Sequence, residues 1–103
     1  MLNPNRTVNV AVQVLPITSD DIYAIVDQAI AVIANSGVKY EVTAMETVME
    51  GTLDMLLDVA KQVHLAVMEA GVDKAVTIIK IGDSANGTTI DEKVAKYREG
   101  KPA

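Results

Sequence analysis

Two stretches of the chain repeat one plan, in which a β-strand pattern is followed by an amphipathic helix pattern that ends at a glycine. Residues 6–15 alternate between valine and small or polar side chains, a period of two that indicates a half-buried strand. Residues 22–35 place apolar side chains three and four positions apart, which predicts a helix with one buried face. Gly37 and Gly71 end the two helix patterns, because glycine readily takes the left-handed conformation found after a helix. Any fold of this chain must therefore pack two helices against the strands that precede and follow them.

The remaining patterns complete the order of elements. Residues 38–50 predict two short strands joined by a turn near residues 44–47, and residues 75–81 form an apolar run that indicates an interior strand. Pro16 is expected to end the first strand, and residues 89–92 form a capping box that opens a short last helix. The order strand, helix, strand, strand, helix, strand, helix predicts an α+β, ferredoxin-like split βαβ domain. Its four-stranded antiparallel sheet carries two helices on one face, and a short C-terminal helix follows.

The composition fits a single domain over residues 1–103 and excludes several classes of function. Half of the residues are hydrophobic and 22% are charged, as in globular proteins. The formal net charge is −5 and the chain has neither Phe nor Trp, so we expect no nucleic-acid partner. The chain has no cysteine and one histidine, which excludes disulfides, thiolate chemistry and a multi-histidine metal site within the chain. We expect neither a metal nor a cofactor.

The start of the chain and the length of its apolar runs bear on where the protein acts. The first six residues do not combine a charged segment with an apolar run, as a signal peptide does. No apolar run approaches the roughly 20 residues that span a bilayer. We therefore expect a cytoplasmic protein with no membrane partner.

The second face of the first strand predicts self-association. Asn9, Ala11 and Gln13 alternate with the valines, so they lie on the sheet face that the two crossover helices leave uncovered. These side chains are polar but uncharged, which suits contact with another sheet or a small ligand. The alternative is a face that is simply solvated.

Few side chains form a pattern that suits catalysis. His64 lies on the apolar stripe of the second helix, where it could contact a ligand or respond to pH, or could simply be a half-buried, hydrogen-bonded residue. Glu46 and Glu50 could act as an acid–base pair, or could be charges that protect an exposed strand from aggregation. We expect Lys80 to balance Glu50 or Asp83. Because no nucleophile lies in any of these patterns, the residues alone favour a ligand-binding or purely associative domain over an enzyme.

Four parts of the sequence carry a family resemblance over residues 8–98. The strings SGVKYEVTAM at 36–45, ETVMEG at 46–51 and VTIIKI at 76–81, together with His64, resemble the YkoF-like thiamine-binding protein family. The resemblance implies a ferredoxin-like fold and assembly into dimers and tetramers through sheet faces and edges. It also implies binding of thiamine or its hydroxymethylpyrimidine portion without catalysis.

The resemblance, together with the hydroxyl groups that a pyrimidine would need, gives a set of candidate ligand-binding residues. They are Tyr40, Thr43, Met45, Thr47, Glu50, His64 and Thr77. Two positions depart from the family pattern. Glu46 stands where the family usually has glycine, and Gly82 to Ser84 replace a stretch that often carries a cation. Both departures lie near the expected pocket.

The first hypothesis is therefore a non-enzymatic protein that binds thiamine or a related pyrimidine in a homo-oligomer. The alternative is a structural or regulatory module whose sheet face binds a protein partner, and a third possibility is a small enzyme that uses His64 with Glu50. Thr47 and Glu50 are three residues apart and so lie on opposite faces of an unbulged strand. We expect Thr47 to face the ligand, while Glu50 orders the start of the second helix at Gly51 or pairs with Lys80.

Overall fold

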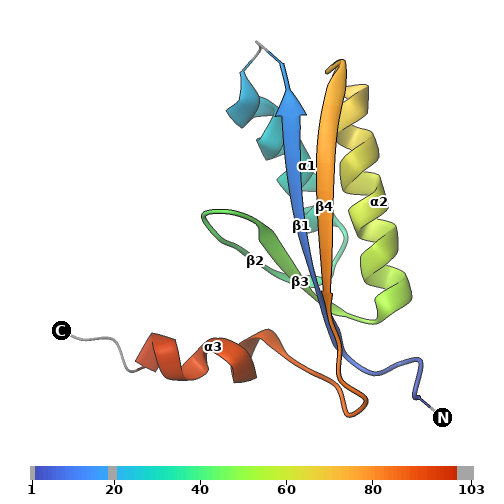
Figure 1. The fold of residues 1–103 in the computed structure, drawn as a ribbon, viewed down its shortest axis with the longest axis vertical. Helices are drawn as coiled ribbons and strands as arrows, with labels where there is room; N and C mark the ends of the chain where they lie inside the picture. The colour runs from blue at the N-terminus through green and yellow to red at the C-terminus, as the bar shows by residue number, and fades with distance from the viewer. Residues whose placement is uncertain (1, 19–20, 100–103) are drawn as a thin grey trace.

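The computed structural model describes residues 2–18 and 21–99. Its elements are β1 (Val8–Ile17), α1 (Ile22–Asn35), β2 (Lys39–Val42), β3 (Thr47–Gly51), α2 (Leu53–Glu69), β4 (Lys74–Gly82) and α3 (Ile90–Glu99). The four strands form one sheet in the order β2-β3-β1-β4, and each neighbouring pair is antiparallel. This is the expected ferredoxin-like α+β arrangement, with α1 and α2 behind the sheet in Figure 1. The expectation of an interior strand over residues 75–81 is wrong, because β4 lies at an edge and pairs with β1 alone.

The two crossover helices and one face of the sheet enclose the core, and we call this face of the sheet the helix face. Val8 and Val10 of β1 and Met49 of β3 are fully buried there, against Leu56 of α2 and Ile33 of α1. Each such side chain contributes roughly 1.5–3 kcal/mol of hydrophobic free energy when it leaves water. The valine alternation of β1 therefore supplies the centre of the core.

The start of α1 follows its capping signal. Asp21 is the N-cap, and its carboxylate accepts hydrogen bonds from the backbone N–H groups of Tyr23 and Ala24 at 3.0 and 3.3 Å. Ser19 and Asp20, which also belong to the expected capping segment, lie outside the described residues. Gly37 follows the helix at φ +84°, a left-handed conformation that glycine adopts without strain.

The expectation that Pro16 ends the first strand is wrong, because β1 continues to Ile17. Beyond Val12, β1 pairs with β4 alone, since the ladder to β3 stops at the pair Val12–Thr47. One side of β1 is therefore an edge at this end, and a proline can lie in a strand where no partner requires its N–H group. The outer end of β1 and β4 is a two-stranded ribbon that projects past β3 (Figure 1).

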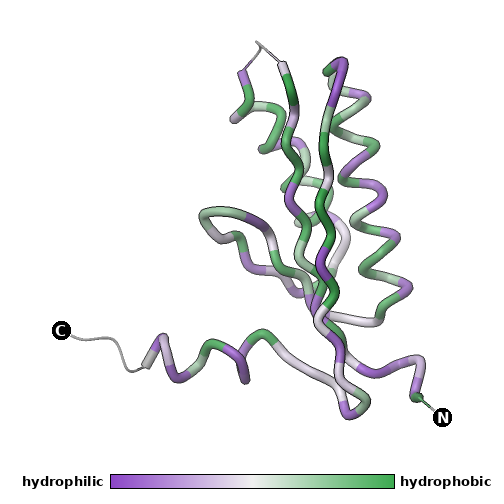
Figure 2. The backbone as a smooth tube through the Cα atoms, viewed as in Figure 1, coloured by the Kyte–Doolittle hydropathy of each residue, from purple (hydrophilic) through white to green (hydrophobic). Residues whose placement is uncertain are grey.

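The face opposite the helix face, here called the open face, is partly apolar. Antiparallel partners share a face, so Leu15 lies beside Val76, and Gln13 lies beside Ile78. Leu15, Val76 and Ile78 are 43%, 48% and 42% exposed. Figure 2 shows hydrophobic positions recurring along β1 and β4 where they form the ribbon.

The expectation that the open face is uncovered within one chain needs a correction at one end. The C-terminal helix α3 lies at the end of the sheet where β1 begins (Figure 1). It contacts this face through the Ile90 N–H group, which donates to Glu50, and the Lys93 ammonium, which donates to Asn9. Asn9 is consequently only 5% exposed. The helix opens with the predicted capping box, in which Thr89 N–H donates to Glu92 Oε1 at 2.9 Å and Glu92 N–H donates to Thr89 Oγ1 at 3.1 Å.

Charge pairs hold α3 to β2. Asp91 accepts hydrogen bonds from Lys39 and from Arg98, both at 2.9 Å, and Arg98 also donates to Glu41 at 2.6 Å. The hydrogen bond from Lys39, with a second from Arg98, lowers the pKa of the Asp91 carboxyl below its ordinary value. These groups are exposed, so the pairs orient α3 more than they stabilise the domain.

None of the helices in the described ranges has the length and apolar character needed to span a membrane.

Candidate functional site

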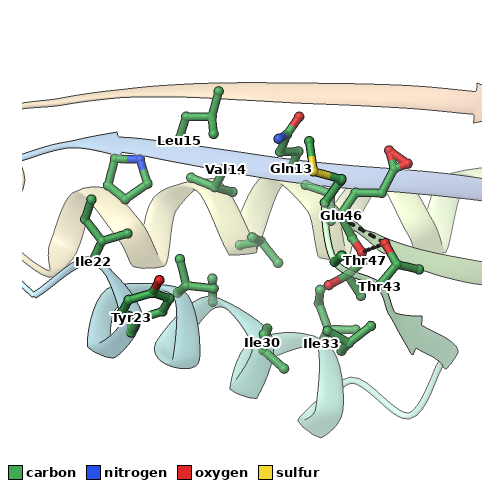
Figure 3. Close-up of a pocket in the computed structure, with 18 residues that line it drawn as sticks. Gln13, Val14, Leu15, Ile22, Tyr23, Ile30, Ile33, Thr43, Glu46 and Thr47 are labelled. Atoms are coloured by element: carbon green, nitrogen blue, oxygen red, sulfur yellow. Dashed lines mark hydrogen bonds between the residues drawn. The ribbon is translucent and has the colours of Figure 1, made fainter.

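A cavity opens on the helix side of the sheet at the point where β1 outruns β3. It has a volume of about 370 Å³ and lies between β1, α1 and the turn that joins β2 to β3 (Figure 3). Val14 of β1 and Ile30 and Ile33 of α1 line it with apolar surface. The missing length of β3 therefore creates the space, because no strand fills the gap beside the outer half of β1.

The turn at the mouth of the cavity is held by its own hydrogen bonds. Thr43 donates to the Glu46 carbonyl from its backbone N–H at 2.9 Å and from its hydroxyl at 2.6 Å, and Glu46 N–H donates back to Thr43 Oγ1 at 3.2 Å. Glycine is the only residue type with a positive φ in the described structure. Glu46, which replaces the usual glycine of the resembled family, therefore fits this turn without backbone strain.

The polar side chains that line the cavity are the hydroxyls of Thr43 and Thr47, the phenol of Tyr23 and one carboxylate, that of Glu46. Thr47 is 6% exposed and lines the inner end, whereas Tyr23 and Met45 are 82% and 73% exposed at the mouth. The Glu46 carboxylate pairs with Lys80 at 2.7 Å, and its side chain keeps only 19% exposure. Glu46 is the sole charged residue among the described residues that line the cavity. This is a surface for a small organic cation with an apolar body.

The candidate residues from the sequence fall into separate places. Thr43, Met45 and Thr47 line the cavity together. His64 and Thr77 instead form a pair between α2 and β4, with 2.6 Å from Nδ1 to the hydroxyl oxygen, and neither lines the cavity. His64 is therefore hydrogen-bonded to a hydroxyl, as the alternative of a half-buried, hydrogen-bonded residue expected.

Tyr40 and Glu50 also lie outside this cavity. Tyr40 is opposite the core residue Met49 on the edge strand β2 and is 39% exposed. Glu50 is opposite Asn9 on the open face, and its Oε1 accepts a hydrogen bond of 2.6 Å from the first N–H of α3, at Ile90. Thr47, opposite the buried Val12, lies on the helix face, so the expectation that Thr47 and Glu50 lie on opposite faces is confirmed.

Two expected charge pairs are replaced by others. Lys80 pairs with Glu46, and neither Glu50 nor Asp83 is its partner. Asp83 pairs with Arg6, whose Nε donates to Asp83 Oδ1 at 2.8 Å. Hydrogen bonding from Arg6 lowers the pKa of the Asp83 carboxyl, so the cation that seemed missing from this loop comes from the other end of the chain.

The contribution of α1 to the cavity was not predicted. Tyr23 and Ile30 line it, and neither was a candidate. The sequence offered one signal for this contribution, the aromatic Tyr23 in the first turn of α1. Its proximity to the β2–β3 turn could not be predicted, because the distance between α1 and that turn depends on how the strands pair. In the described part of the chain, no group of three or more His, Asp or Glu side chains could hold a metal ion.

A family model described as thiamine-binding protein matches residues 10–98. The chain belongs to the thiamine-binding protein family. The match contains both elements that form the cavity wall, β1 from Val10 onward and α1, together with the turn between β2 and β3.

Relatives and solved structures agree with membership of the thiamine-binding protein family. A UPF0045 protein of Clostridium perfringens is 44% identical over 93 residues, covering 89% of this chain and 98% of the relative. A solved domain of unknown function, DUF77, from Bacillus cereus superposes with a TM-score of 0.88 at 46% identity and covers 97% of this chain and 99% of its own. A Thermotoga maritima protein, assigned provisionally to thiamine biosynthesis or salvage, superposes with a TM-score of 0.83 at 33% identity, covering 89% and 99%.

Proposed function

We propose that this protein binds thiamine, or its hydroxymethylpyrimidine portion, in the cavity between β1, α1 and the β2–β3 turn, and that it does so without catalysis. The observation that carries the proposal is the combination of one carboxylate, Glu46, with hydroxyl groups and a largely apolar wall. Membership of the thiamine-binding protein family supports it.

The chemistry of thiamine matches the groups of the cavity. Thiamine carries a permanent positive charge on its thiazolium ring, and Glu46 can share its carboxylate between that ring and Lys80, because a carboxylate accepts several hydrogen bonds. The aminopyrimidine has a donor and acceptor edge that suits the Thr47 hydroxyl. Tyr23 at the mouth offers an aromatic face to the cation.

We further propose that the protein acts as a homo-oligomer that joins through the open face. The exposed side chains of Leu15, Val76 and Ile78 form an apolar strip on this face, which favours contact with a second copy over a solvated surface. The same strip is the observation that favours the second candidate function, a module that binds a different protein.

The proposed function is tested by thermal unfolding in the presence of thiamine, hydroxymethylpyrimidine or thiamine diphosphate. A ligand at 100 times its dissociation constant adds about 2.7 kcal/mol to the stability of the folded state. We expect thiamine to raise the unfolding midpoint more than its diphosphate, because Glu46 repels phosphate and the described lining contains no Lys or Arg. The proposal fails if none of the three compounds moves the midpoint.

The hydroxyl of Thr47 is expected to contribute to binding. Thr47→Val keeps the shape of the side chain and removes the hydroxyl, so calorimetric titration should show thiamine binding weakened by roughly 1 kcal/mol. Thr77→Val is the matched control, because it removes the same hydroxyl group from a threonine that contacts His64 and lies outside the cavity. Equal losses in the two variants, or a loss only in Thr77→Val, would place the ligand elsewhere.

Glu50 is expected to act on stability and not on thiamine. Glu50→Gln removes the charge that accepts the N–H of Ile90 and lies 3.7 Å from Lys39. Urea unfolding should show a loss of about 1 kcal/mol, the scale of one ordinary hydrogen bond, because Gln keeps an oxygen acceptor but loses the charge; thiamine affinity should be unchanged. Lost affinity at unchanged stability would assign Glu50 to the ligand.

A further inference from the structure

A second cavity, which shares only Thr43 and Glu46 with the thiamine cavity among the described lining residues, contains a buried side-chain amide whose nitrogen has no partner. Asn9 is 5% exposed, and its Oδ1 accepts a hydrogen bond of 2.7 Å from Lys93 Nζ. An ammonium group only donates, so this bond fixes which end of the amide is oxygen. Asn9 Nδ2 is then left buried without a hydrogen-bond partner in the described structure. A buried donor of this kind indicates that an acceptor binds there.

Lys93 adds a positive charge at the same place. The other cations at this end of the sheet are neutralised, since Lys80 pairs with Glu46 and Arg98 pairs with Glu41 and Asp91. Among the described residues, Lys93 has no carboxylate within ion-pair distance. The Lys93 ammonium and Asn9 Nδ2 are therefore two hydrogen-bond donors that lie close together and have no carboxylate partner among the described residues.

These donors border a cavity of about 340 Å³ between α3 and the open face. Ala11 and Val48, which pair across β1 and β3, form an apolar floor, and Val94 of α3 adds an apolar wall. The carboxylates of Glu41 and Glu46 also line it. Asn9 and Lys93 do not line the thiamine cavity, so the two sites differ in their donors.

We propose that this second cavity binds a small organic monocarboxylate. The carboxylate accepts hydrogen bonds from Asn9 Nδ2 and from the Lys93 ammonium, and the apolar body lies on Ala11 and Val48. The ligand reaches Nδ2 by displacing the flexible end of the exposed Lys93 side chain. A monoanion is favoured over a phosphate dianion, because the dianion would bring more negative charge close to Glu41 and Glu46.

The test is an NMR titration with butyrate and, separately, with inorganic phosphate at constant ionic strength. The resonances to follow are the Asn9 side-chain amide and the Gly82 backbone amide, since Gly82 is opposite Asn9 in the sheet and close to Lys93 Nζ. We expect butyrate to shift both in a saturable manner and phosphate to give no saturable shift. Thiamine binding is measured separately, by the unfolding midpoint of the protein without butyrate. A negative butyrate titration therefore leaves the proposed function unaffected.

Three variants make the test specific. Lys93→Met keeps the aliphatic stem and should weaken butyrate binding roughly tenfold or more, the scale of a hydrogen bond to a charged group. In Asn9→Asp the new carboxylate can pair with Lys93, so the variant should fold normally. It should not bind butyrate, because the substitution removes the Nδ2 donor. Lys96→Met is the matched control on α3, where Lys96 lies over the Tyr97 ring and outside the cavity.

The expected pattern is loss in Lys93→Met and Asn9→Asp with retention in Lys96→Met. Shifts that are linear and equal in every variant would overturn the proposal as a general salt effect. A saturable response to phosphate alone would overturn the ligand class. An Asn9 amide that responds to protein concentration but not to butyrate would show that a second copy of the chain supplies the acceptor, which also overturns it.

Discussion

Glu46→Lys is expected to abolish thiamine binding. The substitution replaces the sole carboxylate among the described cavity residues with a cation and leaves Lys80 without its partner. A positive charge then lies where the carboxylate would hold the thiazolium ring, so calorimetric titration should show affinity reduced by roughly 100-fold or more, which corresponds to about 3 kcal/mol. Because Glu46 lies in an exposed turn and its backbone requires no special conformation, the fold should survive.

The control for this variant is Glu69→Lys. Glu69 lies at the end of α2 and outside the cavity, and the two variants change the net charge of the chain equally. Glu69→Lys should therefore lower thiamine affinity only as far as the long-range attraction between the acidic protein and the thiamine cation is reduced. Similar affinities in the two variants would show that Glu46 does not contact thiamine.

The second large effect is expected at the open face. Ile78→Lys places a charge at one end of the apolar strip, beside Gln13, and each copy in a symmetric dimer would carry the change. Because Ile78 is 42% exposed in one chain, the apolar surface lost from the two copies amounts to roughly 1–2.5 kcal/mol per dimer, and burying the two lysines adds a further desolvation cost. Light scattering at micromolar concentration should give a multiple of 11.0 kDa for the unmodified protein and 11.0 kDa for the variant.

Leu65→Lys is the matched control for the open face. Leu65 is 45% exposed on α2, close to the 42% of Ile78, and α2 lies on the other side of the sheet. This variant should keep the mass of the unmodified protein. An unmodified protein that scatters as 11.0 kDa at high concentration would end the proposal of self-association.

The fold could be predicted from the sequence because its signals are local and repeated. The valine alternation around Val10, the glycines after both helices and the capping box at Thr89 each specify an element without reference to the rest of the chain. The end of β1 was misjudged because a proline rule that holds inside a sheet does not hold where a partner strand is missing. The length of β3 decides that, and β3 is a different segment of the chain.

The candidate site could be predicted only in part, for the same physical reason. Thr43, Met45 and Thr47 are neighbours in sequence, so a turn brings them together wherever it lies. Tyr23 and Ile30 reach the cavity through the packing of α1 on the sheet, which no local pattern specifies. The partners of Lys80 and Asp83 were missed because each pair joins segments far apart in the chain.

The most direct test of the thiamine cavity uses the methionine methyl groups of the protein as reporters. Met45 lines the cavity, Met68 lies one helical turn from His64, and Met55 is exposed elsewhere on α2. In a thiamine titration of protein labelled with ¹³C at the methionine methyls, we expect a saturable shift of Met45 and unchanged positions of Met55 and Met68. A saturable shift of Met68 with Met45 unmoved would contradict the account and place thiamine beside His64 and Thr77.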